Sequence, residues 1–195
     1  DCPDCGGQLS EVRKFNLMLK TFLGPVESEE NVVYFRPETA QGMFVNFKNI
    51  LDTMRPDLPF GIAQIGKAFR NEITPGNFIF RTREFEQMEI EYFVKPRIDA
   101  DKTQMNADEP EKWFEYWRKE MHEWMKLVGI NTKKVHELDV PDGERAHYSA
   151  RTMDFEYDFP FGKKELYGLA NRTDFDLKNH SEKSGIDLRY REEGS

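Results

Sequence analysis

The chain has 195 residues, a formal net charge of −8 and 33% charged residues. This length suits one domain with a hydrophobic core, or one domain with a smaller insertion. The sequence contains no apolar run as long as a membrane span and does not begin with a signal-peptide pattern. Its acidic balance argues against nucleic-acid binding by this segment, because a nucleic-acid interface is usually basic.

The cysteines lie together at the N-terminus, where Cys2 and Cys5 form a CxxC sequence followed by two glycines. The sequence is typical of half a zinc ribbon, and we assign residues 1–14 to such a partial knuckle. Structural zinc takes four ligands, and no second CxxC or close histidine pair follows. We therefore expect two free thiols in a surface turn, with a half zinc site as the alternative. Two neighbouring cysteines give no disulfide framework and suit the reducing cytoplasm, where we place the protein.

The next segments predict two strands and a helix. Residues 15–19 form an apolar run and residues 32–35 a β-prone one, with a polar loop at residues 24–31 between them. Thr39 is a suitable N-cap for a helix that ends at Arg55-Pro56. Apolar residues at helical spacing are expected to face the core: Phe44, Phe47, Leu51 and Met54. Glu38, at the strand-to-helix junction, either faces a ligand or stabilises the helix N-terminus.

Residues 60–93 predict an antiparallel hairpin whose arms flank a turn at Pro75-Gly76. Side chains alternate between the two faces of a strand. One face therefore carries Gly66, Ala68, Arg70 and Glu72 from the first arm and Arg81, Arg83, Phe85, Gln87, Glu89 and Glu91 from the second. Met88, Ile90 and Tyr92 occupy the other face.

This mixture of arginines, carboxylates and one phenylalanine is a poor core, but it suits a small charged ligand with an aromatic part. The alternative is a solvated face with cross-strand ion pairs. The small residues Gly66 and Ala68 favour the ligand, because they leave space beside the charged groups.

After Pro96 the composition predicts an exposed loop, followed by an amphipathic helix at about residues 110–128. Asp108 can cap this helix and Gly129 can end it. Its aromatic stripe is assigned to the core, with His122 beside it at the surface: Trp113, Trp117, Met121, Trp124 and Val128.

The C-terminal part predicts one more hairpin and a short helix. Residues 131–145 are polar and interpreted as a loop, whereas residues 153–159 alternate with period two and pair with a strand at residues 164–170. The following segment leads into a short helix that ends near Gly185.

Several strings of residues resemble a known family. Phe69-Arg70-Asn71-Glu72, followed by Arg83-Glu84-Phe85 and Glu89, resembles motif 2 of the class II aminoacyl-tRNA synthetases. The upstream string from Arg36 to Gly42 (Arg-Pro-Glu-Thr-Ala-Gln-Gly), with Phe-Val-Asn-Phe after it, narrows the resemblance to the glycyl-tRNA synthetases of the homodimeric type. The similarity extends from about Cys2 to Gly185.

The resemblance implies an α+β fold with a class II synthetase-like antiparallel β-sheet flanked by helices. Residues 15–195 would then form part of the catalytic core, with the motif 2 hairpin at about residues 60–93 and an insertion at about residues 97–147.

The resemblance also implies a function, the ATP-dependent ligation of glycine to tRNA(Gly) through a glycyl-adenylate, with Mg²⁺ on the phosphates. Arg70 would be the catalytic residue, because it stabilises the charge that develops on the α-phosphate. The implied ATP-binding residues are Arg70, Asn71, Glu72, Phe80, Arg81, Arg83, Phe85, Glu165 and Leu166, of which Glu165 also holds Mg²⁺. The implied glycine-binding residues are Glu38, Phe85, Glu86, Gln87, Met88, Glu89 and Arg172.

Selecting glycine requires a particular kind of pocket, because one methylene contributes only about 1–3 kcal/mol of discrimination. Carboxylates such as Glu38 and Glu89 would surround the ammonium group, and the pocket would leave no space at Cα. The clustered carboxylates repel one another, so we expect them to hold their shape only with the cation bound.

Motif 1, motif 3 and an anticodon-binding domain are not visible in the sequence. We therefore expect the middle of a catalytic domain from a larger, homodimeric enzyme, and we do not expect this chain alone to be fully active. Two alternatives remain: a non-catalytic synthetase-like accessory or nucleic-acid-binding protein, and a class II synthetase for another small amino acid such as serine, threonine or proline.

Overall fold

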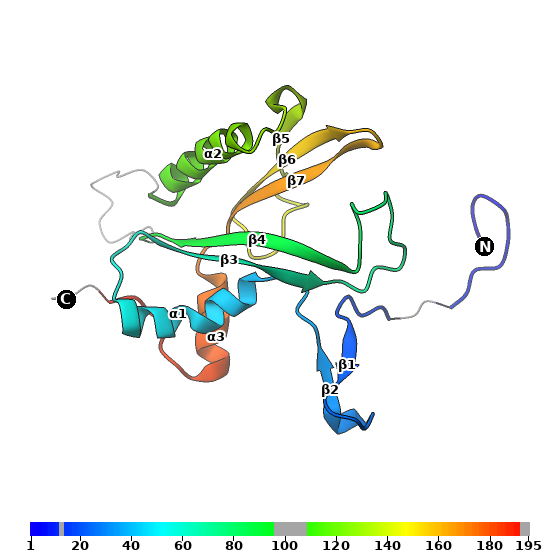
Figure 1. Cartoon of the computed structure of the whole chain (residues 1–195), viewed down its shortest axis with the longest axis horizontal. Helices are drawn as coiled ribbons and strands as arrows, with labels where there is room; N and C mark the ends of the chain where they lie inside the picture. Colours follow the sequence, from blue (N-terminus) through cyan, green and yellow to red (C-terminus); the bar gives the residue numbers. More distant parts are fainter. Residues whose placement is uncertain (12–13, 96–108, 192–195) are drawn as a thin grey trace. The chain divides into compact units, whose positions relative to one another are not determined.

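A computed structural model describes residues 1–11, 14–95 and 109–191 (Figure 1). The fold is α+β, as predicted, with helices and antiparallel strand pairs. The chain separates into two compact units, which are described separately: unit 1 comprises residues 1–39 and 65–88, and unit 2 comprises residues 40–64 and 89–195. Among the described residues, no helix has both the length and the apolar character that crossing a membrane requires.

Unit 1 contains a short antiparallel pair formed by β1 (Lys20–Phe22) and β2 (Val32–Tyr34), with the 3-10 helix η1 (Glu29–Asn31) before β2. The prediction of a strand at residues 32–35 is confirmed, whereas the strand predicted at residues 15–19 is wrong. That apolar run has no buried face to pack, and the Leu17 side chain is 46% exposed. Its carbonyl accepts a hydrogen bond from the Asn71 amide at 2.7 Å, outside any strand ladder.

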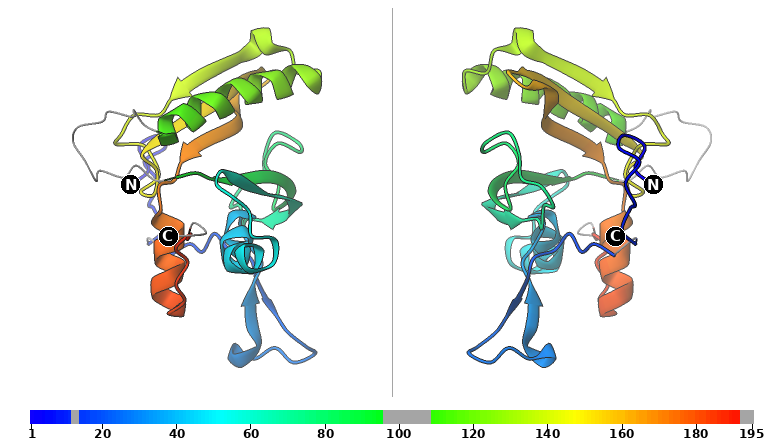
Figure 2. Two further views of the ribbon diagram at one scale, coloured as in Figure 1. Left: turned by 90° about the vertical axis from the view of Figure 1, so that its left-hand side faces the viewer. Right: turned by 90° about the vertical axis from the view of Figure 1, so that its right-hand side faces the viewer.

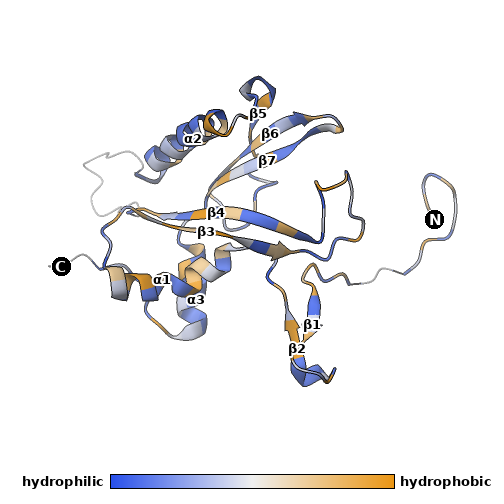
Figure 3. Ribbon diagram, in the orientation of Figure 1, coloured by the Kyte–Doolittle hydropathy of each residue, from blue (hydrophilic) through white to orange (hydrophobic). Residues whose placement is uncertain are grey.

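The predicted hairpin is confirmed: β3 (Phe60–Phe69) pairs with β4 (Glu84–Phe93). Hydrophilic and hydrophobic residues succeed one another along β4 (Figure 3). Half-buried and exposed side chains alternate along β4 up to residue 91, as predicted. The half-buried side chains are Phe85, Gln87, Glu89 and Glu91. The exposed ones are Glu84, Glu86, Met88 and Ile90. The charged and polar face of this strand is therefore the covered one, which a solvated ion-pair face would not be.

In unit 2, α1 (Ala40–Met54) begins one residue after Thr39, where the sequence predicted it. Phe44 and Phe47 are buried, and the Phe47 ring lies 4.6 Å from that of Phe93 on β4. The core assignment of Met54 is wrong, because this side chain in the last helical residue is 75% exposed.

The helix α2 (Glu109–Leu127) lies against an antiparallel sheet in the order β5–β6–β7 (Figures 1 and 2). The strands are β5 (Val135–Asp139), β6 (Arg151–Phe159) and β7 (Gly162–Asn171). Helix and sheet share a core of Phe114, Met125, Met153 and Phe155. The hairpin of β6 and β7 confirms the prediction.

Two expectations for this region are wrong. The loop predicted at residues 131–145 contains the 3-10 helix η2 (Thr132–Lys134) and the strand β5. The face of α2 that packs on the sheet also differs from the predicted aromatic stripe. Phe114, Met121 and Met125 face the sheet, while Trp124 and Val128 are 40% and 46% exposed. Asp108, the predicted cap, lies outside the described residues.

The helix α3 (Phe175–Ser184) confirms the last prediction. Gly185 ends it with a left-handed backbone (φ 70°), and its amide donates to the Ser181 carbonyl, as glycine does at helix C-termini.

Candidate functional site

The predicted site residues divide between the two units, so each group is described on its own. Arg70 follows β3 in unit 1, and its guanidinium lies over the Phe85 ring, 5.3 Å from the ring centroid. Its Nε donates to the Pro37 carbonyl at 3.2 Å. Within the part of the chain that the structure describes, the Arg70 guanidinium forms no ion pair with a carboxylate. The cation is therefore oriented by an aromatic face and a carbonyl without being neutralised.

Backbone hydrogen bonds fix the segments around Arg70. The Arg70 amide donates to the Arg83 carbonyl at 3.0 Å, and Arg83 Nε donates to the Glu72 carbonyl at 3.1 Å. Asn71 is bound to the segment before β1, because its side-chain amide donates to the Asn16 carbonyl at 3.2 Å. In the structure Asn71 thus anchors the turn, and Glu72 remains half-buried beside it.

The turn between β3 and β4 carries two other predicted ATP-binding residues. Arg81 is exposed, and it forms an isolated antiparallel bridge with Gly76 that closes the turn. Phe80 is half-buried, whereas Phe78 is 93% exposed with a left-handed backbone (φ 58°). The bridge closes the turn two residues before Arg83, which is also exposed.

The predicted glycine-binding residues of β4 do not all share one face. Gln87 lies on the covered face with Phe85, while Glu86 and Met88 are exposed on the other. The side-chain oxygen of Gln87 is buried and has no hydrogen-bond donor among the described residues. A buried acceptor without a donor costs free energy, so this atom is suited to receive a donor from a ligand. Glu38, also in unit 1, is half-buried.

In unit 2, Glu165 and Leu166 lie at a β-bulge. Glu156 pairs with Glu165 and Phe155 with Tyr167, so Leu166 is the extra residue on β7. A bulge redirects the neighbouring side chains, and bulges are common beside active sites.

Beside the bulge, a Cβ built on Gly168 would lie 3.3 Å from the Glu165 Oε1 atom and 3.9 Å from Asp154 Oδ1. The absence of a side chain at Gly168 therefore leaves room for two carboxylates.

Asp154 is a candidate that the sequence reasoning missed. Burial raises the pKa of this carboxyl above its ordinary value, and the neighbouring charge of Glu156 raises it further. A cation beside Asp154 would relieve this cost. Alternation along residues 153–159 places Asp154 on the same face as Glu156, but the sequence alone does not show that Gly168 lies opposite Asp154.

The oxygen donors Asp154 and Glu165 fit Mg²⁺, which is usually bound by one or two carboxylates together with substrate phosphates and water. No group of three or more His, Cys, Asp or Glu side chains placed to hold a metal occurs in residues 1–11, 14–95 and 109–191. Two carboxylates alone would thus depend on the nucleotide for the remaining ligands.

Arg172 and Glu89 are the predicted glycine-binding residues of unit 2. The Arg172 side chain forms several interactions within the protein. Its Nε and one terminal nitrogen donate to the two carboxylate oxygens of Asp176, at 2.8 and 3.0 Å. Burial alone would lower the pKa of Arg172, but the hydrogen bonds to Asp176 and the charge of Glu91 raise it above its ordinary value. This arginine is therefore permanently charged and held in place by the protein.

At the N-terminus, Cys2 and Cys5 form a hydrogen-bonded turn in which the Gly6 amide donates to the Cys2 carbonyl at 2.9 Å. Neither cysteine forms a disulfide among the described residues, and Cys5 is exposed in this turn. Hydrogen bonds from the backbone of Cys5 and Asp4 lower the pKa of the Cys2 thiol.

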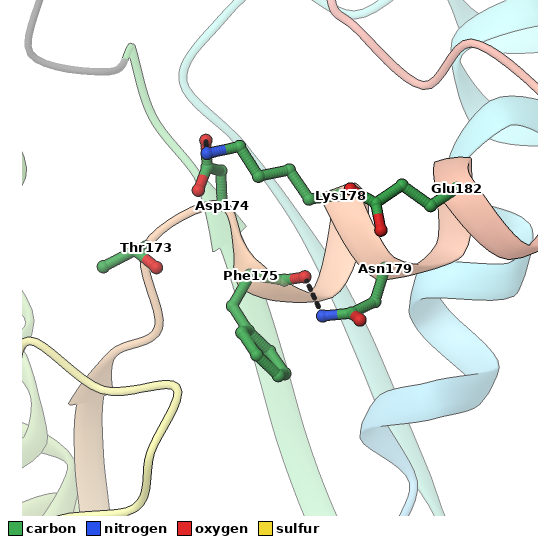
Figure 4. A pocket seen from close by; sticks show the side chains of 6 residues that line it. All are labelled: Thr173, Asp174, Phe175, Lys178, Asn179 and Glu182. Atoms are coloured by element: carbon green, nitrogen blue, oxygen red, sulfur yellow. Dashed lines mark hydrogen bonds and ion pairs between the residues drawn. The ribbon is translucent and has the colours of Figure 1, made fainter.

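A shallow pocket on the surface of α3 contains none of the predicted site residues (Figure 4). It is lined by Thr173, Asp174, Phe175, Lys178, Asn179 and Glu182. This pocket is therefore not the candidate site, whose residues are those described above for each unit.

Sequence comparison assigns the chain to a family. The sequence model described as "tRNA synthetase class II core domain (G, H, P, S and T)" matches residues 25–187. The chain belongs to this family, which agrees with its α+β fold and with the resemblance of its hairpin to motif 2.

The similar curated proteins are more specific. A "Glycine--tRNA ligase" of Geobacillus thermodenitrificans is 55% identical over 97% of this chain and 38% of the relative. Proteins of the same name from Caldanaerobacter subterraneus and Acetivibrio thermocellus are each 53% identical over 97% of this chain and 39% of the relative. The chain thus spans about two fifths of the length of these relatives.

Proposed function

We propose that this chain is part of the catalytic core of a glycine–tRNA ligase, which joins glycine to tRNA(Gly) through a glycyl-adenylate. Its substrates would be glycine, ATP and tRNA(Gly). The observation that carries the proposal is the Arg70 guanidinium, which lies over the Phe85 ring and forms no ion pair with any carboxylate of residues 1–11, 14–95 and 109–191. The relatives that match 97% of this chain are named for glycine ligation and support this choice of amino acid.

The first chemical step is the attack of the glycine carboxylate on the α-phosphorus of ATP, which releases pyrophosphate. Negative charge develops on the α-phosphate oxygens, and an oriented guanidinium stabilises this charge more than it stabilises the bound substrates. Arg70 would provide this stabilisation. Phe85 would stack on the adenine, Arg81 and Arg83 would bind the phosphates, and Asn71 would hold the turn that carries Arg70.

Magnesium would be held by Glu165, and we add Asp154 because it lies with Glu165 over Gly168. When bound, the ion neutralises phosphate charge. The two carboxylates would orient the magnesium ion. Their negative charge would repel ATP phosphates that carry no cation.

Glycine recognition would depend on Glu38 and Glu89 as acceptors for the ammonium group. Gln87 supports this assignment, because its buried oxygen has no donor within the described residues and an ammonium could supply one. Glu86 and Met88 lie on the exposed face of β4, so we do not place them at the ammonium group.

The proposal is tested by ATP–pyrophosphate exchange with the full-length protein that contains this chain. Exchange should depend on glycine and not on serine, threonine, proline or alanine. Exchange driven by one of the other amino acids would identify a different synthetase. No exchange with any of them, together with preserved folding, would favour a non-catalytic accessory protein.

Glu89→Gln tests the glycine role more closely. Because a neutral amide replaces the half-buried anion, we expect the KM for glycine to rise at least about 30-fold. The KM for ATP should change by less than about twofold, since Glu89 would touch only the amino acid. Equal loss of both affinities would refute the assigned role.

A further inference from the structure

A second arginine site lies in unit 2, where Arg172 contacts residues of three other segments. Arg172 follows β7, and Asp176 lies in the first turn of α3. Their side chains are only 16% and 8% exposed. Two parallel hydrogen bonds, at 2.8 and 3.0 Å, fix the guanidinium plane as well as its position.

Two aromatic rings restrict the same guanidinium. Its central carbon lies 3.9 Å from the centroid of the Tyr148 ring, in the loop before β6, and 5.5 Å from that of Phe44, in α1. Arginine stacks on aromatic rings through its planar face, which a lysine cannot do. The edge and the faces of Arg172 are therefore held by different elements.

The charge of Glu91 also acts on Arg172. Glu91 lies two residues from Glu89 on the same covered face of β4. Like charges on one face disfavour each other's ionised form, and a cation next to one of them reduces this repulsion.

We propose that Asp176 is a positioning residue for the glycine site: with Tyr148 it fixes the plane and the position of the Arg172 guanidinium, which the family resemblance assigns to glycine binding. Asp176 itself acts through Arg172 and not on the substrate. The inference rests on the proposed function, because it takes Arg172 to contact glycine.

The test is Asp176→Asn in the full-length protein, measured by ATP–pyrophosphate exchange. The amide keeps the shape but loses the charge and one of the two acceptor oxygens, so Arg172 is released. We expect the KM for glycine to rise about tenfold, with the KM for ATP within about twofold. A merely structural role would reduce the amount of active enzyme and hence kcat, and would leave the KM for glycine unchanged.

Asp174→Asn is the matched control. Asp174 forms an ion pair of the same spacing with Lys178 in the same helix, at 2.9 Å, but both side chains are more than 60% exposed (Figure 4). This variant should keep the wild-type KM for both substrates, because exposed pairs contribute little.

A double-mutant cycle shows whether Asp176 acts through Arg172. In an Arg172→Lys background, Asp176→Asn should change the KM for glycine by less than about twofold, since the planar fork that it positions is already lost. Should the two effects multiply, the inference is overturned. If Asp176→Asn does not fold, Tyr148→Leu is measured in its place with the same expected direction, and an unchanged KM for glycine would overturn the inference.

Failure of the inference and failure of the proposed function give different results. A wild-type protein without glycine-dependent exchange would overturn both. A wild-type protein that exchanges with glycine, together with an Asp176→Asn variant that behaves like Asp174→Asn, would overturn the inference alone.

Discussion

Two arginines of this chain differ in how the protein holds them. Arg70 is oriented by the Pro37 carbonyl and the Phe85 ring, and within the described residues it forms no ion pair. Arg172 is bound through two hydrogen bonds to Asp176 and lies over the Tyr148 ring. We propose that this contrast reflects two roles: the charge of Arg70 is left for a ligand, while the charge of Arg172 is compensated inside the protein by Asp176. The predictions below test this contrast, from the largest expected effect to the smallest.

Arg70→Ala should reduce the rate of glycine-dependent exchange by about 10²–10³-fold, because a preoriented charge that stabilises the transition state is lost. The free energy of unfolding should change by less than about 1 kcal/mol, since no ion pair is broken. Exchange kinetics and urea unfolding measure the two effects. Arg189→Ala is the control, because Arg189 is 82% exposed and pairs with the exposed Asp187. A folded Arg70→Ala protein with normal exchange would remove Arg70 from the site.

Arg172→Met should behave in the opposite way and destabilise the protein by about 3 kcal/mol. It leaves the Asp176 carboxylate, which is 8% exposed, without its cation. Urea unfolding of the variant measures this loss. If Arg172→Met unfolds at the same urea concentration as the wild type, the two arginines are not held differently and the contrast fails.

Arg151 is an intermediate case that sharpens the comparison. It pairs with Glu111, with Glu115 at 2.8 Å and with Asp139 at 3.1 Å, where α2 meets the sheet. Arg151→Met should cost only about 1–2 kcal/mol, because the carboxylates left behind are nearly half exposed and become hydrated. The KM for glycine should stay at the wild-type value.

Lys126→Ala is the control for Arg151→Met, since Lys126 and Glu123 are both 57% exposed. It should change the free energy of unfolding by less than about 0.5 kcal/mol. A loss at Lys126 as large as that at Arg151 would show that burial does not determine the strength of these pairs.

The smallest effect concerns acid stability. Hydrogen bonds from Arg118 and His122 lower the pKa of Glu137 to about 2, although burial opposes the shift. A lowered folded-state pKa contributes stability above the unfolded value, and this contribution is lost as the pH falls from about 4.5 towards 2. Glu137→Gln should therefore flatten the decrease in the free energy of unfolding over this pH range, by about 1 kcal/mol. An unchanged pH dependence would contradict the assignment.

Local patterns predicted the hairpin and its faces, because alternation along β4 depends only on strand geometry. They also predicted α1, the hairpin of β6 and β7, and the glycine that ends α3. The family resemblance, and not the pattern, supplied the roles of Arg70, Phe85 and Glu89.

The errors arose where burial depends on distant segments. β5 was interpreted as a loop because it is largely exposed, with a half-buried Val135, so its sequence lacks a strand pattern. In α2 the tryptophans suggested the core face, but the sheet packs on Phe114 and Met125, while Trp113 and Trp117 pack against Tyr92. Asp154 was missed because its significance depends on Gly168, which lies opposite it on β7.

The central claim is that the covered face of the hairpin binds an activated glycine. Its most direct test is thermal unfolding of the full-length protein with non-hydrolysable glycyl- and alanyl-adenylate analogues at equal concentration. A ligand that binds only the folded state stabilises it by mass action. We predict that the glycyl analogue raises Tm by several degrees and that the alanyl analogue raises it far less, because its methyl group has no space at Cα. Equal shifts with both analogues, or no shift with the glycyl analogue, would contradict the account.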